Sequence, residues 1–195
     1  MSLKLIIYFL ISLIPLFFWY KLAIKKGFKV DLRLILSYFI FGSWFGMYGE
    51  LFLYKIIDVI FHSPIWEYRI LPIHKQITSS YGPFMWGVAS IYICFHHNYS
   101  LIQFKNQSKI LAFISEAGYL LVLEVIFNVL ACFMFNQYFF YYHVPDLWHL
   151  TSFTNMPFWW VGYKMVVKYG DLLNGNEKLN AAIAFIMIVV AIFPN

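Results

Sequence analysis

The sequence predicts an all-α membrane protein, a polytopic transmembrane helix bundle of about six spans. Residues are 62% hydrophobic and only 12% charged, about half the charge of a soluble domain. Apolar runs of about 20 residues recur along the chain, and this is the length at which a helix crosses a bilayer. We therefore expect residues 1–195 to form a single integral membrane domain, without a separate soluble domain and without an internal repeat.

The first three spans are predicted at residues 5–20, 34–54 and 81–97. The first has no small-residue cleavage site, so we interpret it as a retained helix and not as a signal peptide. A basic loop separates it from the second span, which could continue to residue 61. Gly82-Pro83 marks the start of the third span.

The last three spans are predicted at residues 110–135, 151–167 and 179–193. A short loop with lysines precedes the fourth span. The connection before the fifth span, residues 136–149, is aromatic and holds no lysine or arginine. Asn155 and Pro157 interrupt the fifth run, which makes it the least regular of the six.

Positive charge is biased to one side of this topology. The loops after spans one, three and five hold Lys21, Lys25, Lys26, Lys29, Arg33, Lys105, Lys109, Lys164, Lys168 and Lys178. The opposite side holds only Lys4, Lys55, Arg69 and Lys75. The positive-inside rule places the first set in the cytoplasm, with both termini outside. We expect a multi-pass protein of a bacterial inner membrane, whose formal charge of +5 reflects topology and not nucleic-acid binding.

Glu50 is a charged residue inside the second apolar run. A charge at the bilayer centre costs about 2.5–3.5 kcal/mol on insertion scales, so such residues are rare and usually functional. Gly42, Gly46 and Glu50 recur every four residues and share one helical face. Because small residues let another helix approach closely, we expect Glu50 to point into the bundle.

Glu116 and Glu124 interrupt the fourth run and lie about two turns apart on one helix. They should face broadly the same way at different depths. Buried carboxyl groups of this kind are candidate proton donors and acceptors, although hydrogen bonds between helices are a purely structural alternative. His96 or His97, at the end of the third span, is a candidate partner for Glu116.

The outer connections hold the other candidate site residues. Glu67 and Arg69 lie in the first connection, and Arg69 could bind a carboxylate or an anionic headgroup. His143, Asp146 and His149 lie in the second connection with metal-binding side chains, but their spacing matches no established signature, so we predict no metal. These connections could cap a cavity shared by the membrane glutamates.

Cofactor motifs are absent from the sequence. It has no phosphate-binding loop, nucleophile elbow, zinc-protease helix or dinucleotide fingerprint, so we expect no cofactor. If ATP drives this protein, a partner ATPase must supply it. The expected partners are membrane lipids and a lipophilic small-molecule substrate, with a homo-oligomer also allowed.

Two short motifs carry family resemblances. Tyr48-Gly49-Glu50, followed about thirty residues later by Tyr81-Gly82-Pro83, resembles the small multi-span family labelled type-IV ABC-transporter permease, CmpB-like. Glu124 and residues 138–143 fall in comparable places, and the resemblance implies a multi-helix fold and a role in transport. Trp66-Glu67-Tyr68-Arg69 is similar to the sterol-isomerase type of small membrane enzyme, which implies alkene protonation and a carbocation stabilised by aromatics and carboxylates.

Three functions remain open. The first is a lipid-phase acid/base enzyme, an isomerase or cyclase acting on an isoprenoid or another lipid, with Glu50 and Glu124 as acid and base. The second is a permease or transport component whose carboxylates bind protons or cations. The third is a structural assembly subunit. The aromatic content of 23% favours the enzyme, because aromatic walls can stabilise a cation.

Overall fold

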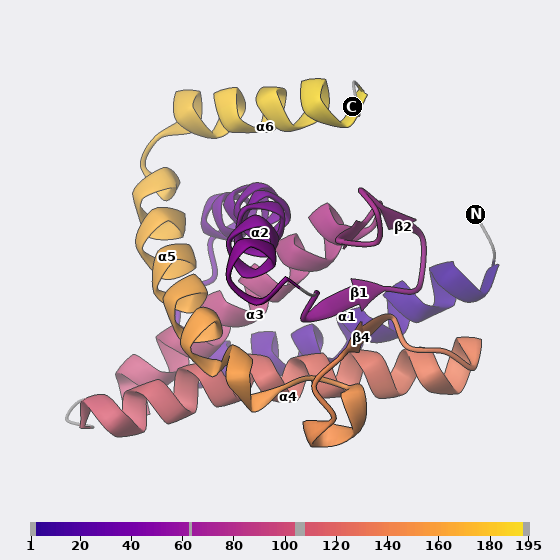
Figure 1. The fold of residues 1–195 in the computed structure, drawn as a ribbon. Helices are drawn as coiled ribbons and strands as arrows, with labels where there is room; N and C mark the ends of the chain where they lie inside the picture. The colour runs from indigo at the N-terminus through magenta and orange to yellow at the C-terminus, as the bar shows by residue number, and fades with distance from the viewer. Residues whose placement is uncertain (1–2, 63, 104–107, 193–195) are drawn as a thin grey trace.

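The computed structural model describes residues 3–62, 64–103 and 108–192, and within these ranges the chain is mostly helical (Figure 1). The α-helices are α1 (Leu3–Lys25), α2 (Leu32–Phe61), α3 (Gly82–Gln103), α4 (Lys109–Phe135), α5 (Met156–Asn174) and α6 (Glu177–Ile192). The short strands and 3-10 turns are β1 (Trp66–Tyr68), β2 (Pro72–Ile73), β3 (Thr78–Ser79), β4 (Phe140–Tyr142), η1 (Asp146–His149) and η2 (Phe153–Asn155). Each predicted span overlaps one α-helix. Lys105, which was counted in the charge bias, and residue 193, the end of the predicted sixth span, lie outside the described residues.

Local sequence signals set the ends of the two longest helices. Asp31 and Ser108 cap the starts of α2 and α4, where each side chain accepts a hydrogen bond from a backbone N–H of the first turn. His62 and Asn136 end the same helices in the left-handed conformation, and each donates its backbone N–H to the carbonyl four residues earlier.

Helices α1 and α4 lie side by side and antiparallel. Near the start of α1, the Tyr8 hydroxyl donates to the carbonyl of Phe127 at 3.1 Å. Near its end, Trp19 contacts Tyr119 with ring centroids 5.8 Å apart. These are the two helices of the described ranges that are long and apolar enough to cross a membrane. The other four do not meet that criterion, so a six-span bundle stays a prediction.

Helix α2 packs closely on α3 through small residues. A Cβ atom at Gly42 would lie 1.8 Å from the Ser90 hydroxyl oxygen, and one at Gly46 would lie 2.0 Å from Trp86. The predicted small-residue face is therefore confirmed, and α3 is the helix that approaches it.

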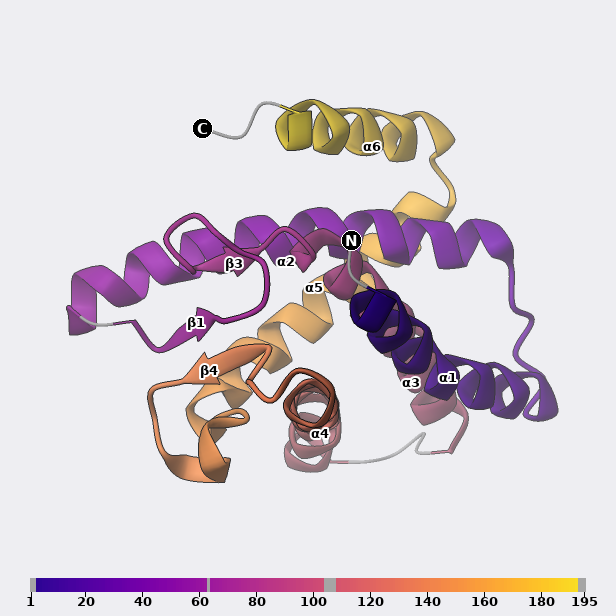
Figure 2. The ribbon, with the colours of Figure 1, turned by 90° about the vertical axis from the view of Figure 1, so that its right-hand side faces the viewer.

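The helices do not form one parallel bundle. Helix α4 runs across Figure 1 and is seen end-on in Figure 2, whereas α2 is seen end-on in Figure 1 and runs across Figure 2. The axes of α2 and α4 therefore cross steeply. Apolar length predicts where helices form, but it carries no information on crossing angles, which depend on the side chains at each contact.

Strand pairing joins the two connections that follow α2 and α4. Strands β1 and β4 pair antiparallel, with Trp66 opposite Tyr142, Glu67 opposite Tyr141 and Tyr68 opposite Phe140. Strands β2 and β3 form a second small pair inside the first connection. The two connections are thus held together beside the helices, as the proposed cap requires.

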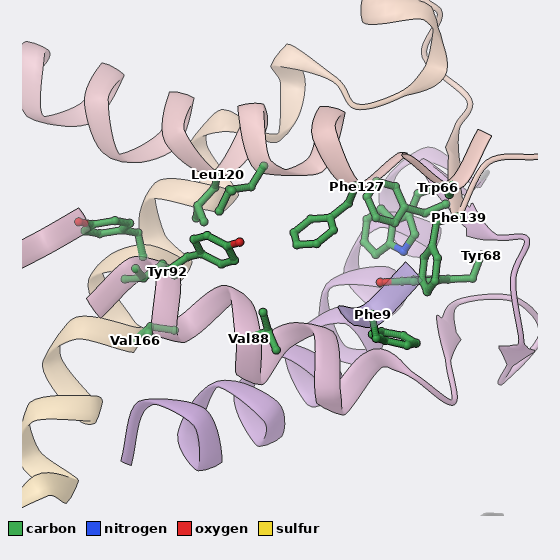
Figure 3. Close-up of a cluster of buried hydrophobic side chains, with 14 of the residues drawn as sticks. Phe9, Trp66, Tyr68, Val88, Tyr92, Leu120, Phe127, Phe139 and Val166 are labelled. Carbon is green, nitrogen blue, oxygen red and sulfur yellow. The ribbon is translucent and has the colours of Figure 1, made fainter. Parts of the chain in front are cut away.

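A continuous apolar core runs from these strands along α3 and α4 (Figure 3). Phe127 and Phe139 lie near Tyr68 in this core, and Tyr92 and Val166 lie at its far end. Tyr68 and Phe139 meet edge to face, with ring centroids 6.0 Å apart. The core thus continues from the strands into the helices.

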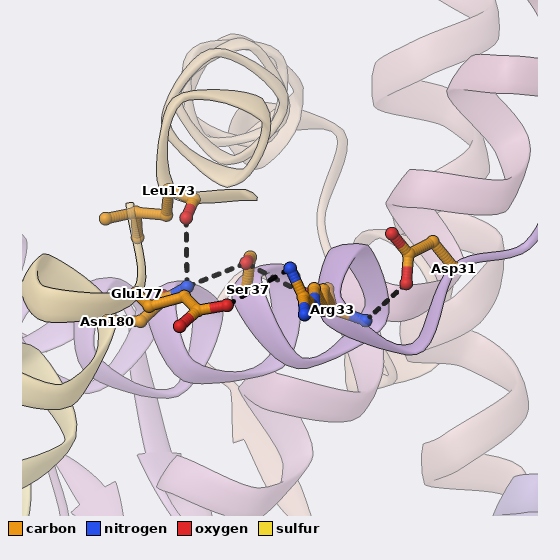
Figure 4. Close-up of polar contacts among 6 residues, drawn as sticks. All are labelled: Asp31, Arg33, Ser37, Leu173, Glu177 and Asn180. Atoms are coloured by element: carbon orange, nitrogen blue, oxygen red, sulfur yellow. Dashed lines mark hydrogen bonds and ion pairs between the residues drawn. The ribbon is translucent and has the colours of Figure 1, made fainter. Parts of the chain in front are cut away.

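Helix α6 is held against the start of α2 by polar contacts (Figure 4). The Asn180 side chain donates to the Ser37 hydroxyl and to the carbonyl of Leu173, each at 2.9 Å. Exposed Arg33 and Glu177 form an ion pair at 3.1 Å beside them. Because both ion-pair partners are exposed, the amide contacts fix this docking more firmly than the charges do.

Candidate active site

Glu50 is held by hydroxyl groups from the first connection. It lies on α2, where Tyr68 of β1 donates to one carboxyl oxygen and Thr78 of β3 donates to the other at 2.9 Å. Both donors lie on strands, whose pairing fixes their positions relative to the helix. The carboxyl group is thus oriented by a hydroxyl on each oxygen.

Glu124 is held in the same manner by the second connection. It lies on α4, where Tyr142 of β4 donates to one oxygen at 2.6 Å. Thr151 and the indole N–H of Trp159, at 3.0 Å, donate to the other. Because an indole N–H can only donate, the oxygen that faces Trp159 must accept.

Both glutamates line one cavity of about 60 Å³, which is room for a few water molecules. Its walls are otherwise apolar and aromatic. The remaining lining residues are Trp66, Tyr68, Met85, Trp86, Ala89, Leu120, Leu123, Phe127, Phe140, Tyr142 and Trp159. Two acidic side chains in such a space can exchange protons with a bound molecule.

The two phenols remain proton donors throughout the physiological pH range. Burial, followed by the charge of Glu50, raises the pKa of Tyr68 well above its usual value, and Glu124 adds to this effect. Burial, followed by the charge of Glu124, raises the pKa of Tyr142 in the same direction. Each phenol is therefore influenced by both glutamates, which places the two carboxyl groups in one electrostatic environment.

Glu116 lies away from the cavity lining and forms an ion pair with Lys164 of α5 at 2.5 Å. The expected partner was His96 or His97, but no hydrogen bond joins either of them to Glu116 among the described residues, and His96 contacts the Tyr163 hydroxyl at 2.9 Å. Equal depth in a membrane cannot decide which neighbouring helix supplies a partner. The other carboxyl oxygen of Glu116 is buried without a hydrogen-bond partner among the described residues.

Glu67 and Arg69 also lie outside the cavity lining. They form an ion pair with each other, and the Arg69 guanidinium lies 5.2 Å from the ring centre of Tyr141. Successive residues of a strand point to opposite sides, so Tyr68 faces the cavity while its two neighbours face away. Arg69 is half-exposed, so it remains available to an anion at the surface.

His143, Asp146 and His149 make separate contacts. Asp146 accepts hydrogen bonds from the hydroxyl of Ser152 and from the backbone N–H that follows it. His149 contacts the carbonyl of Tyr142 at 2.7 Å, and His143 is exposed. No group of three His, Cys, Asp or Glu suited to a metal ion occurs in the part of the chain that the structure describes.

Sequence reasoning did not assign the hydrogen-bond donors of the two glutamates as site residues: Tyr68, Thr78, Tyr142, Thr151 and Trp159. In the sequence the threonines resemble ordinary loop residues, and the tryptophan resembles a member of an interfacial aromatic belt. A signal was available in the spacing of the sequence. After each glutamate comes a Thr-Ser pair, and a tryptophan lies seven residues beyond the serine of that pair.

In comparisons with known proteins, no family model, curated protein or solved structure matches this chain. The class that the fold and the site define is therefore a mostly helical protein with two candidate membrane helices and a paired-glutamate cavity.

Proposed function

We propose that this protein is a lipid-phase acid/base enzyme, an isomerase or cyclase acting on an isoprenoid or another unsaturated lipid. The observation that carries the proposal is the placement of Glu50 and Glu124 on one aromatic-walled cavity. An enzyme that moves a proton needs a donor and an acceptor within reach of one bound molecule. Two carboxyl groups on one cavity wall are a candidate donor and acceptor pair, which supports the proposal.

The proposed reaction begins when one carboxyl group donates its proton to a double bond of the substrate. The resulting carbocation is stabilised by the faces of Trp66, Trp86 and Trp159, at about 0.5–2 kcal/mol for each well-placed ring. The second glutamate, as a carboxylate, then removes a proton from a neighbouring carbon. In an isomerase the double bond has then moved. In a cyclase a second double bond of the substrate attacks the cation and closes the ring before the proton is lost. The reaction is redox-neutral, and the proton returns from the second glutamate to the first before the next turnover.

The proposal places the protein in the membrane, as a multi-pass protein of a bacterial inner membrane. Large apolar side chains of the two candidate membrane helices are exposed, among them Phe18 at 67% and Phe133 at 87%. Such surfaces are costly in water and favourable in lipid. Membrane lipids are then both the solvent of the protein and the source of its substrate.

The test compares lipid extracts from cells that express the wild type, Glu50→Gln or Glu124→Gln, with Glu116→Gln as a matched control. Glutamine keeps the shape of glutamate, but it replaces one acceptor oxygen by an NH2 donor and cannot transfer a proton. We expect a lipid product in the wild type and in the control, and its loss in both cavity variants at unchanged expression. Full product formation by Glu50→Gln would remove this residue from the chemistry.

The second candidate function is a permease or transport component, in line with the CmpB-like resemblance. The supporting observation is that two carboxyl groups facing one cavity could also bind a proton or a cation. This function predicts ion-coupled uptake into vesicles or a co-purifying partner ATPase, and the lack of both would exclude it.

The third candidate function is a structural assembly subunit. Its support is that every oxygen of Glu50 and Glu124 already accepts a hydrogen bond within the chain. It predicts that the glutamine variants change thermal stability and leave lipid composition and uptake unchanged.

A further inference from the structure

The two halves of the described chain repeat one structural unit, in contrast to the prediction of no internal repeat. In the first half, a long helix is followed by β1, a turn and α3; in the second, a long helix is followed by β4, a turn and α5. Glu50 of the first helix corresponds to Glu124 of the second. Eighteen residues after each glutamate comes the tyrosine that binds it, Tyr68 or Tyr142.

The polar contacts recur at the same spacing. Thr78 follows its glutamate by 28 residues and Thr151 by 27, and each hydroxyl donates to that glutamate. The next residue is serine in both halves. Ser79 and Ser152 each accept the backbone N–H of the residue two positions later, at 3.2 Å.

Unusual backbone conformations recur as well. His62 and Asn136, which end the long helices, have φ angles of 53° and 55°. Three successive residues with positive φ occur in each connection, at positions 74–76 and again at 147–149. Positive φ is uncommon outside glycine, so the recurrence of a three-residue run indicates that the same turn is built twice.

A local two-fold axis relates the strand pair and the two glutamate half-sites. It does not extend to the helices, because α2 packs against α5 while α4 lies farther from α3. Glu67 and Tyr141 are equivalent positions and lie opposite each other in the strand pair. The pair on one side of them, Trp66 and Tyr142, is equivalent to the pair on the other side, Phe140 and Tyr68. The backbone N–H of Arg69 donates to residue 139 at 2.9 Å, and that of its equivalent His143 donates to residue 65 at 2.8 Å. Reciprocal contacts of this kind are the mark of a two-fold interface.

The cavity lies on this axis. Trp86 and Trp159 are equivalent, and their ring centroids are 5.2 Å apart in the cavity wall. Four equivalent pairs line the space: Glu50 and Glu124, Trp66 and Phe140, Tyr68 and Tyr142, and Trp86 and Trp159. The cavity therefore lies between two copies of one unit, as a binding site at a homodimer interface would.

We propose that this cavity is one composite site, in which two equivalent glutamate–tyrosine–threonine half-sites act together on a single lipophilic molecule bound across the local two-fold axis. The proposal deepens the proposed function and rests on it for the nature of the ligand. It assigns Tyr68 and Tyr142 as paired positioning residues, each of which orients the carboxyl group of its own half. The substrate class we propose is an unsaturated lipid of which only a short reacting segment enters the space of about 60 Å³ between the two carboxyl groups.

The first experiment needs no substrate. Infrared spectra of the full chain in lipid nanodiscs are recorded over a pH titration, and Glu50→Gln and Glu124→Gln assign the two carboxyl bands. We expect Tyr68→Phe to shift the Glu50 band and Tyr142→Phe to shift the Glu124 band. Tyr92→Phe is the matched control, because it removes another buried hydroxyl, one that donates to a backbone carbonyl at 2.8 Å. It should shift neither carboxyl band.

Coupling across the axis is the second readout of the same titration. Glu50→Gln should move the pH midpoint of the Glu124 band, and Glu124→Gln should move that of the Glu50 band. Independent midpoints, or a phenol whose removal leaves its carboxyl band unchanged, would overturn the composite site. Because this readout requires no turnover, it separates the composite site from the proposed enzyme.

The third readout is the lipid product, with host membrane extract as substrate. Loss of product in both Tyr68→Phe and Tyr142→Phe, at unchanged thermal stability, supports joint action on one ligand. Full product formation in either variant would show that one half-site is dispensable. Absence of product in the wild type would instead refute the proposed enzyme while the infrared result stands.

Discussion

Substituting Gly46 by alanine tests how closely α2 and α3 must approach. The added Cβ would lie 2.0 Å from Cγ of Trp86 and 2.5 Å from its Cβ, near the root of that side chain. A rotamer change can move Cγ but not the Cβ atom 2.5 Å away, so the helices must separate. Overpacking of this kind costs about 1–3 kcal/mol, and the better helix propensity of alanine offsets about 0.5–1 kcal/mol of it. We expect a net loss of about 0–2.5 kcal/mol in the free energy of unfolding, so that Gly46→Ala lies about 1–3 kcal/mol below a variant that has the propensity gain alone.

Gly49→Ala is the matched control on the same helix. Its added Cβ would meet nothing within 4 Å, so only the propensity gain of about 0.5–1 kcal/mol should remain. The assay is equilibrium unfolding in one detergent, followed by circular dichroism. If Gly46→Ala proves as stable as Gly49→Ala, the close contact between α2 and Trp86 does not exist in the folded protein.

Three further predictions concern the polar contacts. Asn128→Leu should lower the free energy of unfolding by about 3 kcal/mol or more, because the fully buried side-chain amide forms hydrogen bonds with backbone groups of residues 139, 140 and 150. A loss below about 1 kcal/mol would contradict those contacts. Burial raises the pKa of Tyr68 and Tyr142, so both phenols stay protonated in the folded chain at a pH where they ionise in the unfolded chain. The free energy of unfolding should therefore fall as the pH rises above about 10. Phenylalanine at either position should flatten this fall in thermal melts, and an unchanged slope would count against the buried phenols. Lys164→Met should lower the free energy of unfolding by about 1–3 kcal/mol. The loss is smaller than for a fully buried ion pair, because this lysine is half-exposed. Adding Glu116→Gln to Lys164→Met should restore part of the loss.

The sequence predicted the helices and the cavity glutamates because both are local signals. An apolar run of sufficient length becomes a helix wherever it packs, and each predicted span overlaps an observed helix. Glu50 and Glu124 were recognisable because a carboxyl group in an apolar run is costly wherever it lies. The predicted topology allowed them to share one cavity but did not require it.

The partners of these residues could not be predicted, because they depend on which helices are neighbours. Lys164 was assigned to a cytoplasmic surface and not to Glu116, since charge bias describes a side of the membrane and not a contact. The pairing of β1 with β4 involves strands of three residues, too short for an alternating pattern to be visible. The repeat was missed because the apolar positions of α2 and α4 differ, while only the polar ligands and the turns recur.

The local pairing of each glutamate has a consequence for biogenesis. Tyr68 and Thr78 follow Glu50 within 28 residues, and every partner of Glu124 follows it within 35. During synthesis, each carboxyl group therefore acquires its hydrogen-bond donors from chain that emerges soon after it. Neither glutamate therefore depends on the other half for its hydrogen bonds, whereas the strand pair, the tryptophan contact and the packing of α2 on α5 form after the second unit is complete.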